Sequence, residues 1–140
     1  MTPVTLRRLA GLVDARKNRD LARLEALFAE DRRLQAELGD LTATLARELG
    51  EEADMPPGRQ GLRYIWVEQR SRAIRRRRAE LTAAIRVARA AAVQSLGKHR
   101  ALEDLVDRAE DAEAQARAAR AERESPPPAP SRPTTLGLGD

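Results

Sequence analysis

Apolar residues spaced alternately three and four apart are the feature that most constrains how this chain can fold. An α-helix with this spacing carries one continuous apolar seam, as in a coiled coil. The first such run has nine apolar residues at twelve positions, which are Leu6, Ala10, Val13, Lys17, Asp20, Leu24, Leu27, Asp31, Leu34, Leu38, Leu41 and Leu45. The run predicts a first helix over residues 4–50, with Gly50 as its C-terminal cap.

The polar positions Lys17 and Asp20 interrupt this seam. Apolar residues displaced from the seam stand on either side of them, at Leu9, Leu12, Leu21 and Phe28. A displacement of this kind is what a stutter produces. We therefore expect the apolar stripe to move around the first helix near these two polar residues.

The period stops between residues 51 and 61. Pro56-Pro57-Gly58 lies in this stretch, and proline cannot continue a helix because it lacks a backbone donor and clashes with the preceding turn. We expect the chain to reverse its direction here.

A second periodic run predicts a longer helix over residues 61–124. Counted in heptads, one seam position reads Val67, Ile74, Leu81, Ala88, Ser95, Leu102, Ala109 and Ala116. The other reads Arg70, Arg77, Ala84, Ala91, Lys98, Leu105, Ala112 and Ala119. Twelve of these sixteen positions are apolar. Ser95 and Lys98, together with Gly97 between them, predict a local weakness with a bend or a close approach.

Two long amphipathic helices joined by a short turn bury their seams most simply by folding back on each other. The predicted fold is all-α: an antiparallel two-helix coiled-coil hairpin over residues 1–124, followed by a proline-rich tail over 125–140 that we expect to be disordered. At 1.5 Å per residue the second helix spans roughly 90 Å and the first roughly 70 Å. The second helix must therefore overhang its partner or bend.

The composition argues against catalysis. Aromatic residues make up 2% of the 140 residues, cysteine is absent, and His99 is the single histidine. Such a chain has no thiol nucleophile, no partner for a histidine metal site, and too slender a form for an enclosed pocket. We expect no enzymatic activity, metal or cofactor, and we assign no chemistry to His99. No stretch approaches the roughly 20 apolar residues of a membrane span, so we expect a cytoplasmic protein.

Positive charge is concentrated in the middle of the chain, although the net charge is only +4. Residues 59–100 hold twelve lysine and arginine residues against two acidic ones. The run Arg75-Arg76-Arg77-Arg78 is either a solvated face whose aliphatic stems cover a thin core, or part of a basic collar for an acidic protein partner. The collar also includes Arg63, Arg70, Arg72, Arg86 and Arg89. Nucleic-acid binding is a third interpretation, but only Tyr64 and Trp66 could stack on bases, and we see no base-reading motif.

Tyr64 and Trp66 follow directly after the predicted reversal. Either they cover the open end of the core, where the helix packing stops, or they are exposed anchors for a partner at the tip of the rod. Both interpretations can hold at once for different faces of the rings.

Three stretches of the chain carry a resemblance to a known family. They are Leu6-Arg7-Arg8-Leu9-Ala10-Gly11-Leu12-Val13, Tyr64-Ile65-Trp66, and Ser95-Leu96-Gly97-Lys98-His99-Arg100-Ala101-Leu102-Glu103-Asp104-Leu105. The last is similar to the pattern Gly-Arg-x-x-Ala-Leu-x-x-Leu of the FliJ/YscO family. Members of that family are the coiled-coil stalks of flagellar and injectisome type III secretion ATPases. The resemblance covers residues 5–123.

The resemblance implies a rod without catalysis of its own that couples an export ATPase to protein export. Its terminal end would insert into the central hole of the export ATPase hexamer, through Leu6, Leu9, Leu12, Leu102 and Leu105. Its turn-side half would contact the cytoplasmic domain of an export-gate membrane protein, through Leu41, Trp66, Arg70, Ala73 and Arg77.

The resemblance also implies binding of export chaperones, and attachment to the membrane only through partners at the base of the flagellum. We expect no nucleic acid among its partners. A generic coiled-coil scaffold or adaptor, or a basic rod associated with nucleic acid, is the alternative interpretation of the same residues.

Overall fold

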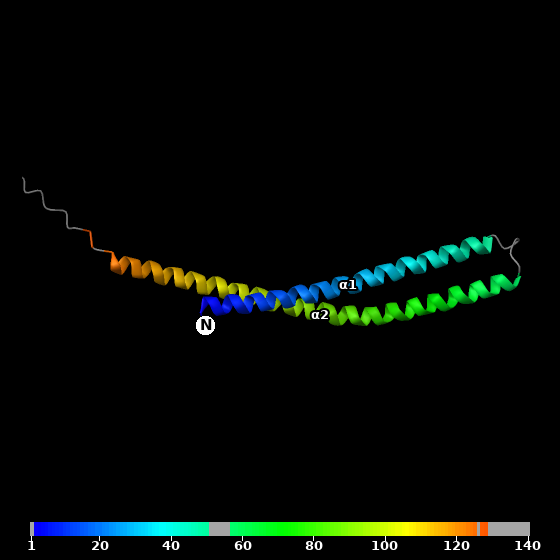
Figure 1. The fold of residues 1–140 in the computed structure, drawn as a ribbon, viewed down its shortest axis with the longest axis horizontal. Helices are drawn as coiled ribbons and strands as arrows, with labels where there is room; N and C mark the ends of the chain where they lie inside the picture. Colours follow the sequence, from blue (N-terminus) through cyan, green and yellow to red (C-terminus); the bar gives the residue numbers. More distant parts are fainter. Residues whose placement is uncertain (1, 51–56, 126, 129–140) are drawn as a thin grey trace, which may run out of the picture.

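The computed structural model describes residues 2–50, 57–125 and 127–128. Within these ranges it contains two helices, α1 (Pro3–Gly50) and α2 (Pro57–Glu124). Figure 1 shows them lying side by side and antiparallel, so that the start of α1 lies next to the C-terminal part of α2. The described chain is therefore a long antiparallel helical hairpin, as the two apolar seams predict.

The helix boundaries differ from the predicted ones chiefly at the start of α2. α2 begins at Pro57 rather than near residue 61. Proline is favoured in the first turn of a helix, because its missing N–H would have no partner there anyway. α1 ends at Gly50 as predicted, but no glycine in the described ranges has a positive φ, so Gly50 does not form a left-handed cap. Residues 51–56 of the predicted reversal and most of the predicted tail lie outside the described residues.

The seam on α1 is confirmed at every position. All twelve residues are buried or half-buried, including the polar members Lys17, Asp20 and Asp31. Leu12, by contrast, is 70% exposed, and Leu9 is exposed too. The predicted stutter is therefore wrong, and the seam keeps one register from its first leucine to its last. Its polar members keep their places because each finds a partner: Asp20 and Asp31 on α2, and Lys17 at Asp14 on α1.

On α2, one predicted seam position is confirmed and the other is wrong. The confirmed position is buried at Val67, Ile74, Leu81, Ala88, Ser95 and Leu102. The second position lies one residue further along the chain than predicted, and its buried or half-buried members are Ser71, Arg78, Ile85, Ala92, His99 and Val106. Among the predicted members, Arg70, Arg77, Lys98 and Leu105 are exposed, and Ala84 and Ala91 are half-buried. The seam thus advances by four residues and then three, as it does on α1.

A thin apolar core holds the two helices together in the turn-side half of the hairpin. It consists of Leu34, Ile74 and Leu81, against which Leu27, Leu38 and Leu41 pack. Leu81 is 0% exposed, and Ile74 is also fully buried. Further along α2 the buried seam residues Ala88 and Ala92 are smaller. Because the stabilisation follows the apolar area removed from water, the leucine-rich half contributes most of it.

The predicted weak point in the middle of α2 is helical throughout. Ser95 is buried there and Lys98 is exposed. A Cβ added at Gly97 would meet no atom within 4 Å, so the predicted close approach is absent at this glycine.

The predicted overhang of α2 is confirmed. Arg7 near the start of α1 lies with its Nε 2.8 Å from Glu110 Oε1, and every residue from Asp111 to Glu124 is exposed. Figure 1 shows this end of α2 running on past the start of α1. The overhang is about 20 Å long at 1.5 Å per residue. The predicted seam members Ala112, Ala116 and Ala119 are exposed because they lie beyond α1.

Candidate partner-binding surfaces

Polar residues within the seam pair across the two helices. Arg78 donates from Nε to Asp31 Oδ1 at 3.0 Å, and both side chains are about one-third exposed or less. The buried hydroxyl of Ser95 donates to Asp20 Oδ2. Every buried side-chain nitrogen or oxygen in the described ranges has a hydrogen-bond partner. Because an unpaired polar group in the seam would be costly, these pairs favour one alignment of the two helices.

A third polar layer lies nearer to the terminal end. His99 Nε2 lies 3.0 Å from Asp14 Oδ1, and Lys17 Nζ lies 2.9 Å from the same oxygen. The hydrogen bond from Lys17 is the largest influence that holds the pKa of Asp14 below its usual value, and the charge of His99 contributes in the same direction. His99 is half-buried and therefore has a place in the helix interface.

Arginines on the flank of α2 bind glutamates of α1. Arg70 donates to Glu37 through two nitrogens, at 2.7 and 2.9 Å. Arg77 does the same to Glu30, at 2.8 and 3.2 Å. These hydrogen bonds stabilise the carboxylate form, so the pKa values of Glu30 and Glu37 lie below the usual one, while the pKa values of both arginines are raised.

The lowered pKa values of Glu30 and Glu37 predict a loss of stability in acid. Because the folded-state pKa lies below the unfolded one, the stabilisation is present above the ordinary pKa of 4.5 and is lost as the pH falls through the folded value. We expect the melting temperature, followed by circular dichroism, to fall between about pH 4.5 and pH 3. A Glu30→Gln/Glu37→Gln variant should show a smaller fall over the same range. An equal fall in both proteins would show that these two pairs do not contribute.

The predicted basic collar is divided between bound and free arginines. Five of its members have carboxylate partners, namely Arg63 with Glu48, Arg70 with Glu37, Arg72 with Glu68, Arg77 with Glu30 and Arg78 with Asp31. Arg89 lies over the ring of Phe28, 5.7 Å from its centroid. Arg75, Arg76 and Arg86 are exposed and make no ion pair within the described residues. The collar is therefore mostly part of the hairpin's own interface.

The residues predicted for the export-gate contact do not form one surface. Leu41 packs against the core, and Arg70 and Arg77 bind α1. Trp66 and Ala73 remain exposed on α2, seven residues apart and so on the same face of the helix. Of the five predicted residues, these two are therefore the ones free to meet a partner.

The residues predicted for the ATPase contact also divide into two groups. Leu6 and Leu102 are buried in the seam. Leu9, Leu12 and Leu105 are exposed at the terminal end of the hairpin. The buried pair can act only by holding the two helices together, whereas the exposed three can touch another protein.

The first turns of α2 carry an exposed apolar surface beside the predicted aromatic anchors. Trp66 is 59% exposed, and Tyr64, Ile65 and Leu62 are exposed as well. The interpretation of Tyr64 and Trp66 as exposed anchors is favoured over that of covers for the core, because more than half of each side chain remains open.

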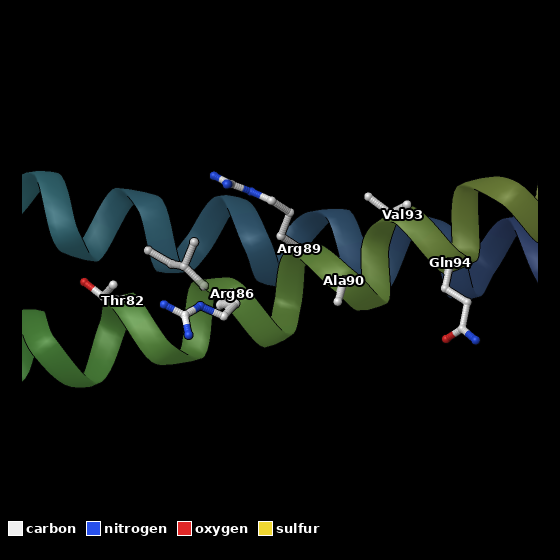
Figure 2. A pocket seen from close by; sticks show the side chains of 7 residues that line it. Thr82, Arg86, Arg89, Ala90, Val93 and Gln94 are labelled. Carbon is white, nitrogen blue, oxygen red and sulfur yellow. The ribbon is translucent and has the colours of Figure 1, made fainter.

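A shallow apolar groove on α2, which the sequence reasoning missed, lies in the middle of the rod. Its lining residues are Thr82, Ile85, Arg86, Arg89, Ala90, Val93 and Gln94. Figure 2 shows them along one side of α2, with Arg89 directed toward α1 and Arg86 lying along α2. Val93 in this groove and Leu96 just beyond it are exposed apolar residues. Residues on α2 outside the main seam also recur every three and four positions, and this second period was the signal in the sequence that could have revealed the groove.

No helix within the described residues is both long and apolar enough to cross a membrane. A scan against protein-family models and searches of curated proteins and of solved structures each return no match. The fold itself defines a class, that of two-helix antiparallel hairpins with one overhanging helix. The resemblance to the FliJ/YscO family stays a prediction that depends on the quoted stretches of sequence.

Proposed function

We propose that this chain is a stalk and coupling component of a flagellar type III protein export apparatus, working in the cytoplasm at the base of the flagellum. The observation that carries the proposal is the rod with one projecting helix: α2 extends from Asp111 to Glu124 beyond its partner, with all side chains exposed. A projecting helix of about 20 Å fits a role in which the terminal end of the rod enters the hole of an ATPase ring. The quoted sequence resemblance supports the same role.

The exposed leucines of the terminal end are the residues proposed to touch the ATPase. Leu9 and Leu12 on α1 and Leu105 on α2 lie near the base of the overhang, whose start is marked by the ion pair of Arg7 and Glu110. Exposed leucines stabilise a complex because their apolar surface is removed from water when the partner binds. Leu6 and Leu102 belong to the seam, and their proposed role is to keep the helices paired.

The turn-side end is the proposed contact for the cytoplasmic domain of the export gate. Trp66 is the proposed anchor, with Ala73 next to it on the same helix face. Export chaperones are the third proposed class of partner. Membrane attachment in this proposal is indirect, through these proteins alone.

The test is to mix the purified chain with the export ATPase. We expect the two to co-elute and the chain to increase both ATP hydrolysis and ring assembly. A Leu12→Asp/Leu105→Asp variant should lose these effects, while Val87→Asp, at an exposed site in the middle of α2, should keep them. All proteins should retain their helical content by circular dichroism. Absence of binding and stimulation by the unaltered chain would overturn the proposal.

A basic rod associated with nucleic acid is the second candidate, favoured by the free arginines Arg75, Arg76 and Arg86. Such binding is electrostatic and weakens strongly as the salt concentration rises. A gel shift that disappears at moderate salt, together with no effect on the ATPase, would favour this candidate over the stalk.

A further inference from the structure

A second stripe of residues runs along α2, outside the hairpin core, with the same spacing of three and four. It begins two residues before the core residue Leu81. It is turned roughly a quarter of the way around the helix from the seam, because each of its members follows a seam position by one residue. Its members are Ala79, Thr82, Arg86, Arg89, Val93, Leu96, Arg100, Glu103, Asp107, Glu110 and Ala114. All are exposed except Glu110, which is half-buried. We call this set the outer stripe.

Charge is separated along the outer stripe. Arg86 and Arg89 lie on one side of its middle. The other side carries one basic and three acidic residues, namely Arg100, Glu103, Asp107 and Glu110, and the exposed apolar residue Leu96 lies between the two halves. Arg89 and Glu103 each lie seven residues from Leu96, and Arg86 and Asp107 lie ten and eleven residues from it. A stripe of this kind is complementary to a copy of itself that runs in the opposite direction.

We propose that the outer stripe is a self-association surface, on which a second copy of this chain docks antiparallel about a twofold axis near Leu96. Arg86 of each copy then faces Asp107 of the other, and Arg89 of each copy faces Glu103 of the other. The two Leu96 side chains meet at the centre, and Val93 of each copy faces the partner copy's stretch around Arg100. This proposal is independent of the export function.

α1 supplies a second exposed leucine at the level of this axis. Arg89 lies over Phe28, which fixes these two residues at one level of the hairpin. Leu21 precedes Phe28 by seven residues and Leu96 follows Arg89 by seven, so the antiparallel helices bring the two leucines to one level as well. Leu21 is 36% exposed and Leu96 is 38% exposed. A twofold axis here gathers four leucines from two hairpins.

The shallow groove described above lies along the basic half of the outer stripe (Figure 2). Ile85, Ala90 and Val93 give it an apolar floor, and Arg86 and Arg89 border it. In the proposed pair it receives side chains from the partner copy's stretch around Arg100 and Glu103. The apolar stems of long side chains can then cover the groove while their charges meet across the interface.

A second copy explains the acidic half of the outer stripe, which a nucleic acid does not. Phosphates placed along the basic half would continue past Leu96 onto Glu103 and Asp107, where like charges repel. An antiparallel copy pairs both halves at once. The charge pattern therefore favours the second copy as the occupant.

The size of the outer stripe sets the expected affinity. From Ala79 to Ala114 it is about 50 Å long, and one helix width is about 10 Å. A contact of this size buries on the order of 500 Å² on each copy, at the low end of specific interfaces. We therefore expect a reversible dimer with a Kd of roughly micromolar order, weakened by salt because its charges lie near the surface.

Sedimentation velocity over a concentration series tests the proposal with a charge exchange. Arg86 and Asp107 suit this exchange because neither makes an ion pair within the described residues. Arg86→Glu alone and Asp107→Arg alone should each weaken self-association by about tenfold or more, because each places like charges opposite one another twice in the dimer. An equimolar mixture of the two variants should dimerise again, since the introduced charges are then complementary. One chain that carries both substitutions should also form dimers.

Arg108→Glu is the matched control, because Arg108 is exposed on α2 but lies off the outer stripe. It should leave the dimer affinity unchanged, and all variants should melt as the unaltered chain does when dilute. The proposal is overturned if the unaltered chain stays monomeric at about 200 μM, well above the expected Kd. It is also overturned if the mixture of the two variants fails to recover dimers, or if Arg108→Glu weakens the dimer as much as Arg86→Glu does.

Discussion

Leu81→Ala is expected to lower the free energy of unfolding by about 3 kcal/mol. Leu81 is 0% exposed and belongs to the small core that Leu34 and Ile74 complete. Removing three carbons there takes apolar area out of the core and leaves a cavity that the two helices cannot easily close. Urea denaturation followed by far-ultraviolet circular dichroism measures the change. Dilute protein should be used, so that dissociation of dimers does not contribute to the transition.

Leu12→Ala is the matched control for this substitution. It removes the same atoms from a helical leucine that is 70% exposed, and we expect its effect to stay within about 0.5 kcal/mol. Equal effects at the two positions would mean that the core does not lie where Leu81 and Ile74 place it.

The double substitution Asp31→Leu/Arg78→Leu is expected to raise the free energy of unfolding by about 2 kcal/mol. Asp31 and Arg78 hold seam positions of α1 and α2 and pair at 3.0 Å. Replacing a partly desolvated ion pair by packed apolar side chains is often neutral or stabilising, because the cost of dehydrating two charges disappears. Here the leucines would also fill a polar gap within the apolar core, since Asp31 lies between Leu27 and Leu34 on α1 and Arg78 lies between Ile74 and Leu81 on α2.

The single substitution Asp31→Leu should be less favourable than the double one, because it leaves the guanidinium of Arg78 in the seam without its carboxylate. Glu68→Ala/Arg72→Ala removes an ion pair that lies within one helix on the surface, and it should change stability by less than about 0.5 kcal/mol. A double leucine variant that is clearly less stable than the unaltered chain would show that the ion pair contributes more than the apolar packing that replaces it.

The seam of α1 could be predicted from the sequence residue by residue, because apolar residues hold nine of its twelve positions and every position from Leu34 to Leu45 is a leucine. The error there was the stutter inferred from Lys17 and Asp20. Hydropathy alone cannot show that Asp20 has the hydroxyl of Ser95 opposite it, since that depends on the alignment of two distant segments. The same lack of information hid the role of His99 beside Asp14.

The second seam position of α2 could not be predicted because alanine is too small to mark a face. Ala84 and Ala91 fit the predicted seam as well as Ile85 and Ala92 fit the true one. Arg78 then belongs to the true seam and Arg77 to its flank, which a run of four arginines does not distinguish. The choice is settled in three dimensions, because Ser71 and Ala92 are buried whereas Arg70 and Arg77 are exposed.

The residues of the candidate surfaces were also predicted only in part, because the sequence alone does not show which way each side chain faces. Trp66 and Leu12 are exposed, so their assignment as partner contacts remains open to test, whereas Leu6 and Leu102 lie in the seam. Leucines selected only by their position along the chain include both exposed ones and ones buried in the seam. Separating them requires the direction in which each side chain leaves its helix.

Cross-linking of introduced cysteines measures the alignment of α1 and α2 most directly, and both proposals depend on this alignment. The chain has no cysteine of its own, so Asp20→Cys/Ser95→Cys places a single pair at two residues that are hydrogen-bonded across the helices. Asp20→Cys/Ala88→Cys shifts one partner by a heptad, about 10 Å along the rod. In dilute solution, a short bis-maleimide should join the first pair within one chain and leave the second largely unjoined. Preferential joining of the second pair, or no joining of either, would contradict the hairpin register described here.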